Sequence, residues 1–415
     1  MAIANNVFSG SFTTSLVAFY KVRYPQRKIE NLIAFDKPFL SSVTRSDELT
    51  GQSTVIPLEL DGPQGMSVSL PTAIDNDSPL VGVAWTITPA TYYAGLRFDA
   101  KTLMASRNDQ GAFFKLQERT TDRLFDTIGL QWEKYLWGAG TASLGTTSAD
   151  PGTATTFTLA SIPDSINFHV NMKVRFYADS SGSPGTERAG GTRTVSGVNY
   201  QTGVITVSAA LDAALGSGDH VVRDGDVSAV FKGIPAWIPA SDPTDTFFGV
   251  ARTPHPQKLG GWRGTWKGSI EETAIALDSQ MRRHNQGARV LWLSYANWSR
   301  LSLELGARAY RPDNGEGAKF GRPSMVMVSP GGPITIKSGP FVPEDAGFLL
   351  DMSTWKLMTL GAAPHMVEDD GLTFRVIGVA DRDGSLAQDG IEGRLRAWLQ
   401  LVCLNPFANG RFVIS

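Results

Sequence analysis

The chain has 415 residues, enough for two or three domains with separate hydrophobic cores. Its 38 Lys and Arg nearly balance 40 Asp and Glu, and the formal net charge of −2 argues against a dedicated nucleic-acid-binding protein. A single cysteine excludes an intrachain disulfide framework and fits folding in a reducing cytoplasm. No stretch reaches about 18 apolar residues and no secretory signal is recognisable, so we expect neither a membrane-spanning nor a secreted protein.

Residues 1–48 are predicted to form a polar N-terminal arm, with a short helix over 11–20. Within residues 1–45, six basic side chains face two acidic ones, an excess of four positive charges. The basic cluster consists of Lys21, Arg23, Arg27 and Lys28. Such an arm is either a solvated terminal segment or a surface for phosphates or an acidic neighbour, where counterion release would make binding depend on salt.

Residues 49–100 alternate between apolar and polar side chains, which predicts strands over 54–60, 83–88 and 92–98. Turn-forming runs lie at 61–65 and 75–79. A long two-stranded hairpin is marginal in water, so we expect this one to rest on another surface.

Residues 109–137 carry apolar side chains at helical spacing and predict a long helix. The apolar row consists of Leu116, Leu124, Ile128, Trp132 and Leu136. Glycines follow at 138 and 140, where they can adopt the left-handed backbone conformation that commonly ends a helix.

After a linker at 141–156, the composition changes to short strands separated by glycine turns. We expect strands over 157–160, 173–178, 192–198, 204–208 and 220–223, with a loop at 180–191. This spacing is typical of a small β barrel or sandwich, inserted into a larger domain over roughly 150–228.

The remainder predicts a mixed α/β region and a closing hairpin. Helices are expected over 269–285 and 296–306, a charged loop over 311–323, and strands over 289–293, 325–328, 334–337, 348–351, 355–360, 372–380 and 394–404. In the last strand one face carries Leu395, Ala397, Leu399, Leu401 and Cys403, which we expect to be buried.

Motifs for catalysis are missing from the sequence: the five histidines are scattered, and no metalloprotease, nucleophile-elbow or Walker pattern occurs. We therefore expect neither an enzyme nor a cofactor. Cys403 is better explained as a small apolar residue than as a nucleophile. One weak metal pattern places Asp381, Asp383, Asp389 and Glu392 at calcium-loop spacing, but Leu386 stands where the sharp turn needs glycine, so an acidic hairpin turn is the default.

The order of these parts resembles the major capsid protein of tailed bacteriophages, an α+β protein with the Hong Kong 97-type fold. The resemblance covers nearly the whole chain except 141–232 and is most specific at 132–140, 233–239 and 401–408. It implies the following division: N-terminal arm 1–48, extended β-hairpin loop 49–100, spine helix of the peripheral domain 101–140, inserted β domain 141–232, axial domain 233–365, and closing strands of the peripheral domain 366–415.

The resemblance implies a structural subunit that assembles into hexamers and pentamers of an icosahedral shell around double-stranded DNA. The hairpin would contact the adjacent subunit through Val55, Ile56, Trp85 and Ile87. The loop at 311–323 would contribute contacts near the capsomer centre through Arg311, Asp313, Glu316 and Lys319.

The basic cluster of the arm would face inward, toward DNA or a scaffold. Implied partners are copies of the chain, a portal, a separate scaffolding protein and a decoration protein, without a membrane. The location would be the virion, after assembly in the host cytoplasm. Residues 46–100 contain no lysine, which argues against the covalent crosslinks that some members form through this loop.

Two alternatives stay open at this point. One is an encapsulin-like shell of the same fold that encloses an enzyme. The other is a hydrolase or carbohydrate-binding protein with an accessory β domain, suggested by the β-rich insertion and by Trp262 and Trp266 as exposed aromatic residues.

Overall fold

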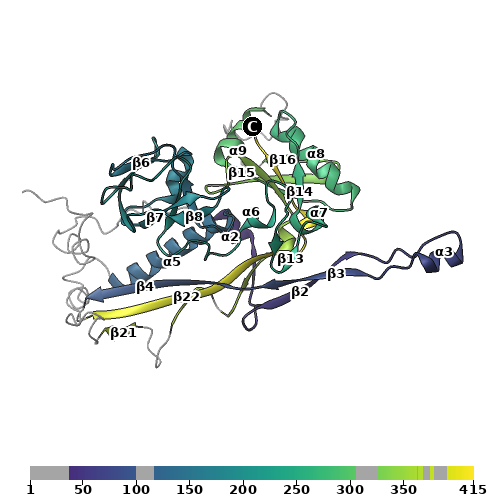
Figure 1. The fold of residues 1–415 in the computed structure, drawn as a ribbon, viewed down its shortest axis with the longest axis horizontal. Coiled ribbons are helices and arrows are strands. Elements are labelled where there is room, and N and C mark those ends of the chain that lie inside the picture. The colour runs from purple at the N-terminus through teal and green to yellow at the C-terminus, as the bar shows by residue number, and fades with distance from the viewer. Residues whose placement is uncertain (1–36, 100–115, 305–324, 362, 368–373, 378–389) are drawn as a thin grey trace, which may run out of the picture. The chain divides into compact units, whose positions relative to one another are not determined.

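The structure is a computed structural model that describes residues 37–99, 116–304, 325–361, 363–367, 374–377 and 390–415. The chain divides into two compact units. Among the described residues, unit 1 contains Thr91–Val230 and Pro364–Ala397, and unit 2 contains Phe231–Ala363, Trp398–Ser415 and the segment that ends at Ala90. Figure 1 shows the elements of both units. None of the described helices is long and apolar enough to cross a membrane.

Unit 1 is built around the long helix α5 (Leu116–Leu136). The predicted apolar row is confirmed in its C-terminal half, because Ile128, Trp132 and Leu136 are at most 2 % exposed. The part of the predicted helix before Leu116 lies outside the described residues. Unit 1 also contains β4 (Ala90–Asp99), β20 (His365–Met366), β21 (Phe374–Ile377) and the first part of β22 (Gly390–Cys403), which pairs with the other three. Side chains from α5, β4, β21 and β22 share one small apolar cluster.

The β-rich part of unit 1 is a small barrel. Its strands are β5 (Ser143–Thr146), β6 (Thr156–Thr158), β7 (Lys173–Asp179), β8 (Pro184–Glu187), β9 (Arg193–Asn199), β10 (Val204–Val207) and β11 (His220–Arg223). They follow the order β5-β11-β7-β9-β10-β6, with β8 paired to β7. A bridge between Thr147 and Leu159 brings the two ends of this order together, so the sheet closes. The short helix η1 (Ile162–Asn167) lies between β6 and β7.

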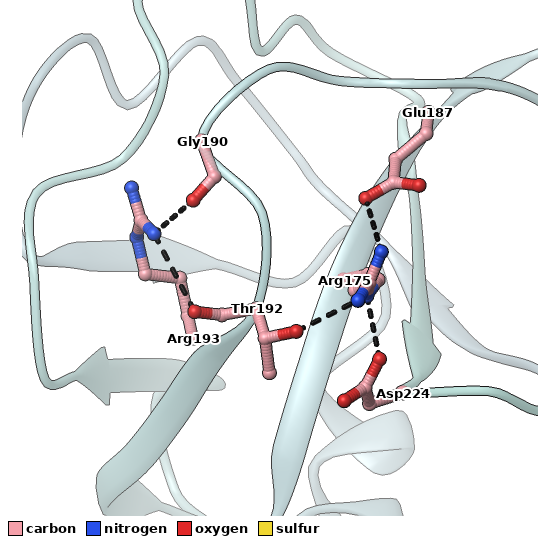
Figure 2. Close-up of polar contacts among 6 residues, drawn as sticks. All are labelled: Arg175, Glu187, Gly190, Thr192, Arg193 and Asp224. Carbon is pink, nitrogen blue, oxygen red and sulfur yellow. Dashed lines mark hydrogen bonds and ion pairs between the residues drawn. The ribbon is translucent and has the colours of Figure 1, made fainter. Parts of the chain in front are cut away.

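Two barrel strands, β5 and β8, were not expected from the sequence, which predicts a linker at 141–156 and a loop at 180–191. Polar side chains fasten the β8 region. Figure 2 shows Arg175 between Glu187 and Asp224, with nitrogen–oxygen distances of 2.9 and 2.5 Å. Arg193 donates to the carbonyl oxygen of Gly190 and holds the next turn. The contacts of Arg175 reach Glu187 and Asp224, which lie 12 and 49 residues further along the chain, and this is why local composition did not reveal them.

Unit 2 contains a six-stranded sheet in the order β14-β23-β18-β15-β17-β16. The strands are β14 (Trp262–Gly264), β15 (Val290–Ser294), β16 (Met325–Ser329), β17 (Gly332–Gly339), β18 (Ala346–Leu350) and β23 (Gly410–Val413). Helices α8 (Ile270–Arg283) and α9 (Tyr295–Glu304) share a hydrophobic core with it. Ser269 caps α8 by accepting a hydrogen bond from the backbone N–H of Glu272.

Shorter elements complete unit 2. They are α2 (Pro38–Ser42), β1 (Thr44–Ser46), α6 (Ile234–Trp237), β12 (Thr246–Phe247), β13 (Val250–Ala251), α7 (Pro256–Gly260), η3 (Met352–Thr354), β19 (Trp355–Thr359) and η4 (Pro406–Ala408). β1 runs parallel to β19, and β19 runs antiparallel to the last residues of β22.

The predicted buried face of β22 is confirmed, since Leu395, Ala397, Leu399, Leu401 and Cys403 are all 0 % exposed. The opposite face is also covered near the end of the strand, where Gln400 is 2 % and Val402 is 0 % exposed. Burial raises the pKa of the Cys403 thiol to about 12. A thiol that stays protonated and enclosed is a packing residue, as the sequence indicates.

Candidate interaction surface

An antiparallel ribbon of two strands in unit 2 is the candidate site. β2 (Thr54–Asp61) pairs with β3 (Val81–Ile87), and the connection between them contains the short helix α3 (Leu70–Asp75). In Figure 1 the ribbon carries α3 at its far end. The third predicted strand, β4, pairs with β22 instead, so the ribbon is shorter than the predicted excursion over 49–100.

The near end of the ribbon, where β2 begins and β3 ends, is anchored in the body of unit 2. Trp85 and Ile87 are both 0 % exposed. The Trp85 ring packs edge-on against Trp237, with centroids 4.9 Å apart. The backbone N–H of Thr86 donates to the carbonyl oxygen of Phe248 at 2.9 Å. Trp85 and Ile87 therefore cannot be the intersubunit contacts that the sequence analysis assigned to them, because their own chain already buries them.

Trp237, on which Trp85 packs, is itself held in place by several contacts. Its indole N–H donates to the carbonyl oxygen of Leu401 at 3.0 Å. The Phe247 ring packs edge-on against it at 4.9 Å. Trp237 is the last residue of α6 and belongs to the segment 233–239, one of the three most specific parts of the resemblance. This segment therefore supplies the side chain on which the ribbon packs.

A polar clip holds the ribbon at the end of β2. The ammonium of Lys258 donates to the carbonyl oxygen of Leu60 at 2.7 Å and forms an ion pair with Asp61. Nδ1 of His255 lies 3.8 Å from the Asp61 carboxylate. The hydrogen bond from Lys258 lowers the pKa of Asp61. Asp61 is the last residue of β2, so the clip attaches the end of this strand to α7 of unit 2.

Beyond the clip, residues 62–80 form the far end of the ribbon, and its large apolar side chains are exposed. They are Met66 at 73 %, Val68 at 110 %, Leu70 at 74 %, Ile74 at 65 % and Leu80 at 55 % exposure. No residue of α3 is buried, and an isolated helix this short is marginal in water. Apolar side chains gathered in this way on a surface are typical of a protein–protein contact. On β2 itself, Val55 is 60 % exposed and Ile56 is half-buried.

Most other predicted site residues lie outside the described residues: Lys21, Arg23, Arg27, Lys28, Arg311, Asp313, Glu316, Lys319, Asp381, Asp383 and Asp389. Glu392 is described, and its carboxylate pairs with Arg97 at 3.0 Å and Arg394 at 2.7 Å. These hydrogen bonds lower its pKa. The described residues contain no group of three or more His, Cys, Asp and Glu that could hold a metal ion.

One chemical constellation that the sequence did not reveal lies in the barrel. The Ser143 hydroxyl is 2.9 Å from Nδ1 of His220, whose Nε2 is 3.1 Å from the Asp179 carboxylate. Asp179 is 46 % exposed, so solvent weakens its hold on the imidazole. The three residues come from β5, β11 and β7, and we interpret the contacts as a tie between these neighbouring strands.

No protein-family model matches the sequence, and no curated protein matches it. Among solved structures, a chain of the cyanophage A-1(L) capsid asymmetric unit is similar, with a TM-score of 0.58 and 12 % sequence identity. The similarity covers 94 % of this chain and 96 % of that chain. The fold is that of a phage capsid chain. This confirms the resemblance at the level of the fold, a mixture of helices and sheets.

Two looser similarities cover as much of the chain. The capsid of a native GTA particle has a TM-score of 0.47 at 8 % identity, over 98 % of this chain and 99 % of that chain. A chain from Mycobacterium phage Adephagia has a TM-score of 0.46 at 10 % identity, over 98 % of each chain. At 12 % identity, the similarity to the cyanophage chain establishes a fold and not an activity, so function has to be argued from the surface itself.

Proposed function

We propose that the protein is the structural subunit of a bacteriophage capsid, and that copies of it assemble into the hexamers and pentamers of an icosahedral shell around double-stranded DNA. The observation that carries this proposal is the far end of the ribbon, where five large apolar side chains are at least 55 % exposed. The capsid-type fold supports it.

The exposed side chains suit contacts between copies. Each one contributes about 1.5–3 kcal/mol when it passes from water into an apolar contact. Several together offset the cost of ordering and docking the ribbon, and a standard interface buries about 800 Å² on each partner. A ribbon that docks on a different surface of the next copy forms a heterologous contact, which closes into rings when the rotation fits.

The anchored near end favours this role over simple disorder. Trp85 and Trp237 fix the start of the ribbon, and Lys258 fixes the end of β2. The far end is therefore presented from a defined base, which lowers the conformational entropy lost on docking.

Removing only the far end tests the proposal. Residues 62–80 are replaced by Asn-Gly, which joins Asp61 to Val81 through a two-residue turn suited to an antiparallel pair. We expect a variant with unchanged circular dichroism that forms no shells by negative-stain microscopy and sedimentation, while the unaltered protein does. A broader deletion of 54–96 would be uninformative, because it would remove Trp85 from the core.

Normal particles from the shortened protein would refute the bridging role of the ribbon. A discrete species of the chain mass, 44.7 kDa, that never assembles even at high concentration or with a scaffolding protein would refute the shell itself.

The contents of the particles distinguish a capsid from the alternative of the same fold, a compartment that encloses an enzyme. Nuclease-protected double-stranded DNA inside particles supports the capsid, and a protein cargo without DNA supports the compartment. The two aromatic residues that suggested carbohydrate binding contact other side chains of the same chain. Trp262 is stacked on Phe407 at 5.2 Å, and the Arg300 guanidinium lies 5.4 Å from the centre of the Trp266 ring. Both indoles are half-buried, contrary to the expectation that they are exposed.

Further parts of the proposal rest on the sequence alone. The basic cluster at 21–28 would face DNA or a scaffold, and the loop at 311–323 would contact other copies near the capsomer centre. The barrel would be an insertion domain. A portal, a scaffolding protein and a decoration protein are the additional partners, in a virion assembled in the host cytoplasm.

A further inference from the structure

The ribbon carries charge of only one sign. Residues 46–96, which include β2, α3 and β3, contain six acidic side chains and no lysine or arginine. Two of these carboxylates, Glu48 and Asp61, are paired with lysines of unit 2. Asp75 and Asp77 at the far end are exposed, and neither forms an ion pair with another described residue. The far end therefore presents two carboxylates beside its five exposed apolar side chains.

A second surface of unit 2 carries charge of the opposite sign. Residues 279–303 run from α8 through β15 to α9, and residues 325–343 contain β16 and β17. Together they include no acidic side chain and five basic ones: Arg282, Arg283, Arg289, Arg300 and Lys337. Arg282 lies 3.4 Å from the buried carboxylate of Asp278. Arg283 and Arg289, in contrast, are exposed and form no ion pair with the residues that the structure describes.

The same surface contains exposed apolar side chains on β16, the edge strand of the six-stranded sheet. Met327 is 4 % exposed and belongs to the hydrophobic core shared with α8. Because side chains alternate along a strand, Val326 and Val328 lie on the opposite face, where they are 55 % and 77 % exposed. Thr335 and Pro333 of β17, which stand opposite them in the register, are also exposed. The described part of the chain therefore leaves this face of the β16–β17 hairpin uncovered.

The residues with the basic side chains border this face. The backbone N–H of Thr335 donates to the carbonyl oxygen of Arg289 at 2.8 Å. The Arg282 guanidinium lies against the turn between β16 and β17, where it leaves no room for a Cβ on Gly331. Arg283 follows directly as the last residue of α8. We define the basic sheet surface as Val326, Val328, Arg283 and Arg289.

We propose that the far end of the ribbon in one copy docks on the basic sheet surface of the next copy. The inference rests on the proposed function and names the surface that receives the ribbon. The carboxylates of the far end meet two guanidinium groups that no described carboxylate of their own chain neutralises. The exposed valines of β16 meet the apolar side chains around α3, so both partners bury apolar area.

Charge and apolar contact have different parts in this docking. Exposed ion pairs add little affinity by themselves, so the apolar side chains supply most of it. The charges select the receiving surface and speed the encounter, because acidic surfaces of the next copy repel the far end. The formal net charge of the whole chain is only −2, so this selection depends on how charges are segregated within unit 2 and not on their sum.

Charge reversal on each side tests the docking in the full chain. One variant carries Asp75→Lys with Asp77→Lys, and another carries Arg283→Glu with Arg289→Glu. Each places like charges in contact, so either pair should raise the protein concentration needed for shell formation by about tenfold or more, as measured by light scattering. The variant with all four substitutions restores opposite charges and should return to within about threefold of the unaltered protein. Urea unfolding followed by circular dichroism verifies that every variant is folded.

The matched control is Arg45→Glu with Lys267→Glu, which reverses two exposed basic side chains of unit 2 outside the basic sheet surface. It changes the net charge as much as reversal of Arg283 and Arg289 does, and it should keep the concentration threshold within about threefold. Raising the ionic strength from about 0.05 M to about 0.5 M should shrink the effect of each reversed pair, because salt screens exposed charges.

Three results would overturn the inference: an unchanged threshold after reversal of Arg283 and Arg289, no recovery in the variant with four substitutions, or an equal rise in the control. If the reversed pair does not fold, Arg283→Gln with Arg289→Gln removes the charges and should still raise the threshold by about threefold. No rise in that variant would again contradict the docking. The proposed function fails separately, when the unaltered protein forms no shells or the shortened ribbon still forms them.

Discussion

The near and far ends of the β2–β3 ribbon have similar apolar content and opposite environments. At the near end, Trp85 and Ile87 are completely buried by their own chain. At the far end, Leu70 is 74 % and Ile74 is 65 % exposed. The difference shows that burial depends on which surfaces lie within reach of a side chain and not on the strand pattern, and under the proposed function the next copy would supply the surface for the far end.

The comparison also changes which residues are expected to matter for assembly. Substitutions at the near end should affect folding, whereas those at the far end should affect association. Three experiments, in order of decreasing effect, test this separation.

Trp85→Ala should break the near end. Removing a large aromatic side chain from a filled core lowers the free energy of unfolding by about 3–5 kcal/mol. Here the lost contacts include the Trp237 ring at 4.9 Å. Urea unfolding followed by circular dichroism measures the change. Val55→Ala is the matched control on the paired strand, and as an exposed site it should change stability by less than about 0.5 kcal/mol. Equal losses in both variants would contradict the anchored near end.

Leu70→Glu with Ile74→Glu should disable the far end without unfolding the subunit. Both positions are exposed, so stability should stay within about 0.5 kcal/mol of the unaltered protein. Charges in a desolvated contact should raise the protein concentration needed for shell formation by about tenfold or more. Light scattering against concentration gives this threshold.

The control for that pair is Ile162→Glu, which places a carboxylate on a barrel residue that is 46 % exposed. It should assemble normally. A variant pair with an unchanged threshold would remove the far end from the assembly contacts.

Lys258→Met should have the smallest effect, because it opens only the polar clip between the two ends. The pKa of Asp61 is lowered from 3.8 by its bond to Lys258. The clip therefore stabilises the folded chain above the ordinary pKa and loses that contribution as pH falls through the lowered value. Hydrogen exchange at the end of β2 should be faster in the variant at neutral pH and converge with the unaltered protein in acid. Lys267→Met, at an exposed site of unit 2, should show no such difference.

Strand positions were predictable where alternation was regular. The predicted strand over 220–223 coincides with β11, and the strand over 54–60 is β2 less one residue. The helix expected over 269–285 is α8, whose buried residues include Leu277 and Met281 at helical spacing. In such segments periodicity alone fixes both the element and its inner face.

Two features were not predictable: strand β8, and the hydrogen bonds that run from Tyr92 through Gln131 and Tyr135 to Asp226. β8 depends on Arg175, which reaches Glu187 and Asp224 from elsewhere in the chain. The same applies to Asn409, whose side chain accepts from the backbone of Asp351 and the indole of Trp355 at 2.8 and 2.9 Å. Such contacts have no local signature, because each partner alone is an ordinary polar residue.

The amino-acid sequence alone predicted the order of ribbon, long helix, β-rich segment and closing strand, because each depends on local periodicity and turn chemistry. Only the tertiary structure decided that Trp85 belongs inside unit 2 while Leu70 remains exposed. Burial and pKa are set by the surfaces and charges that surround a side chain, and these arrive from distant parts of the chain.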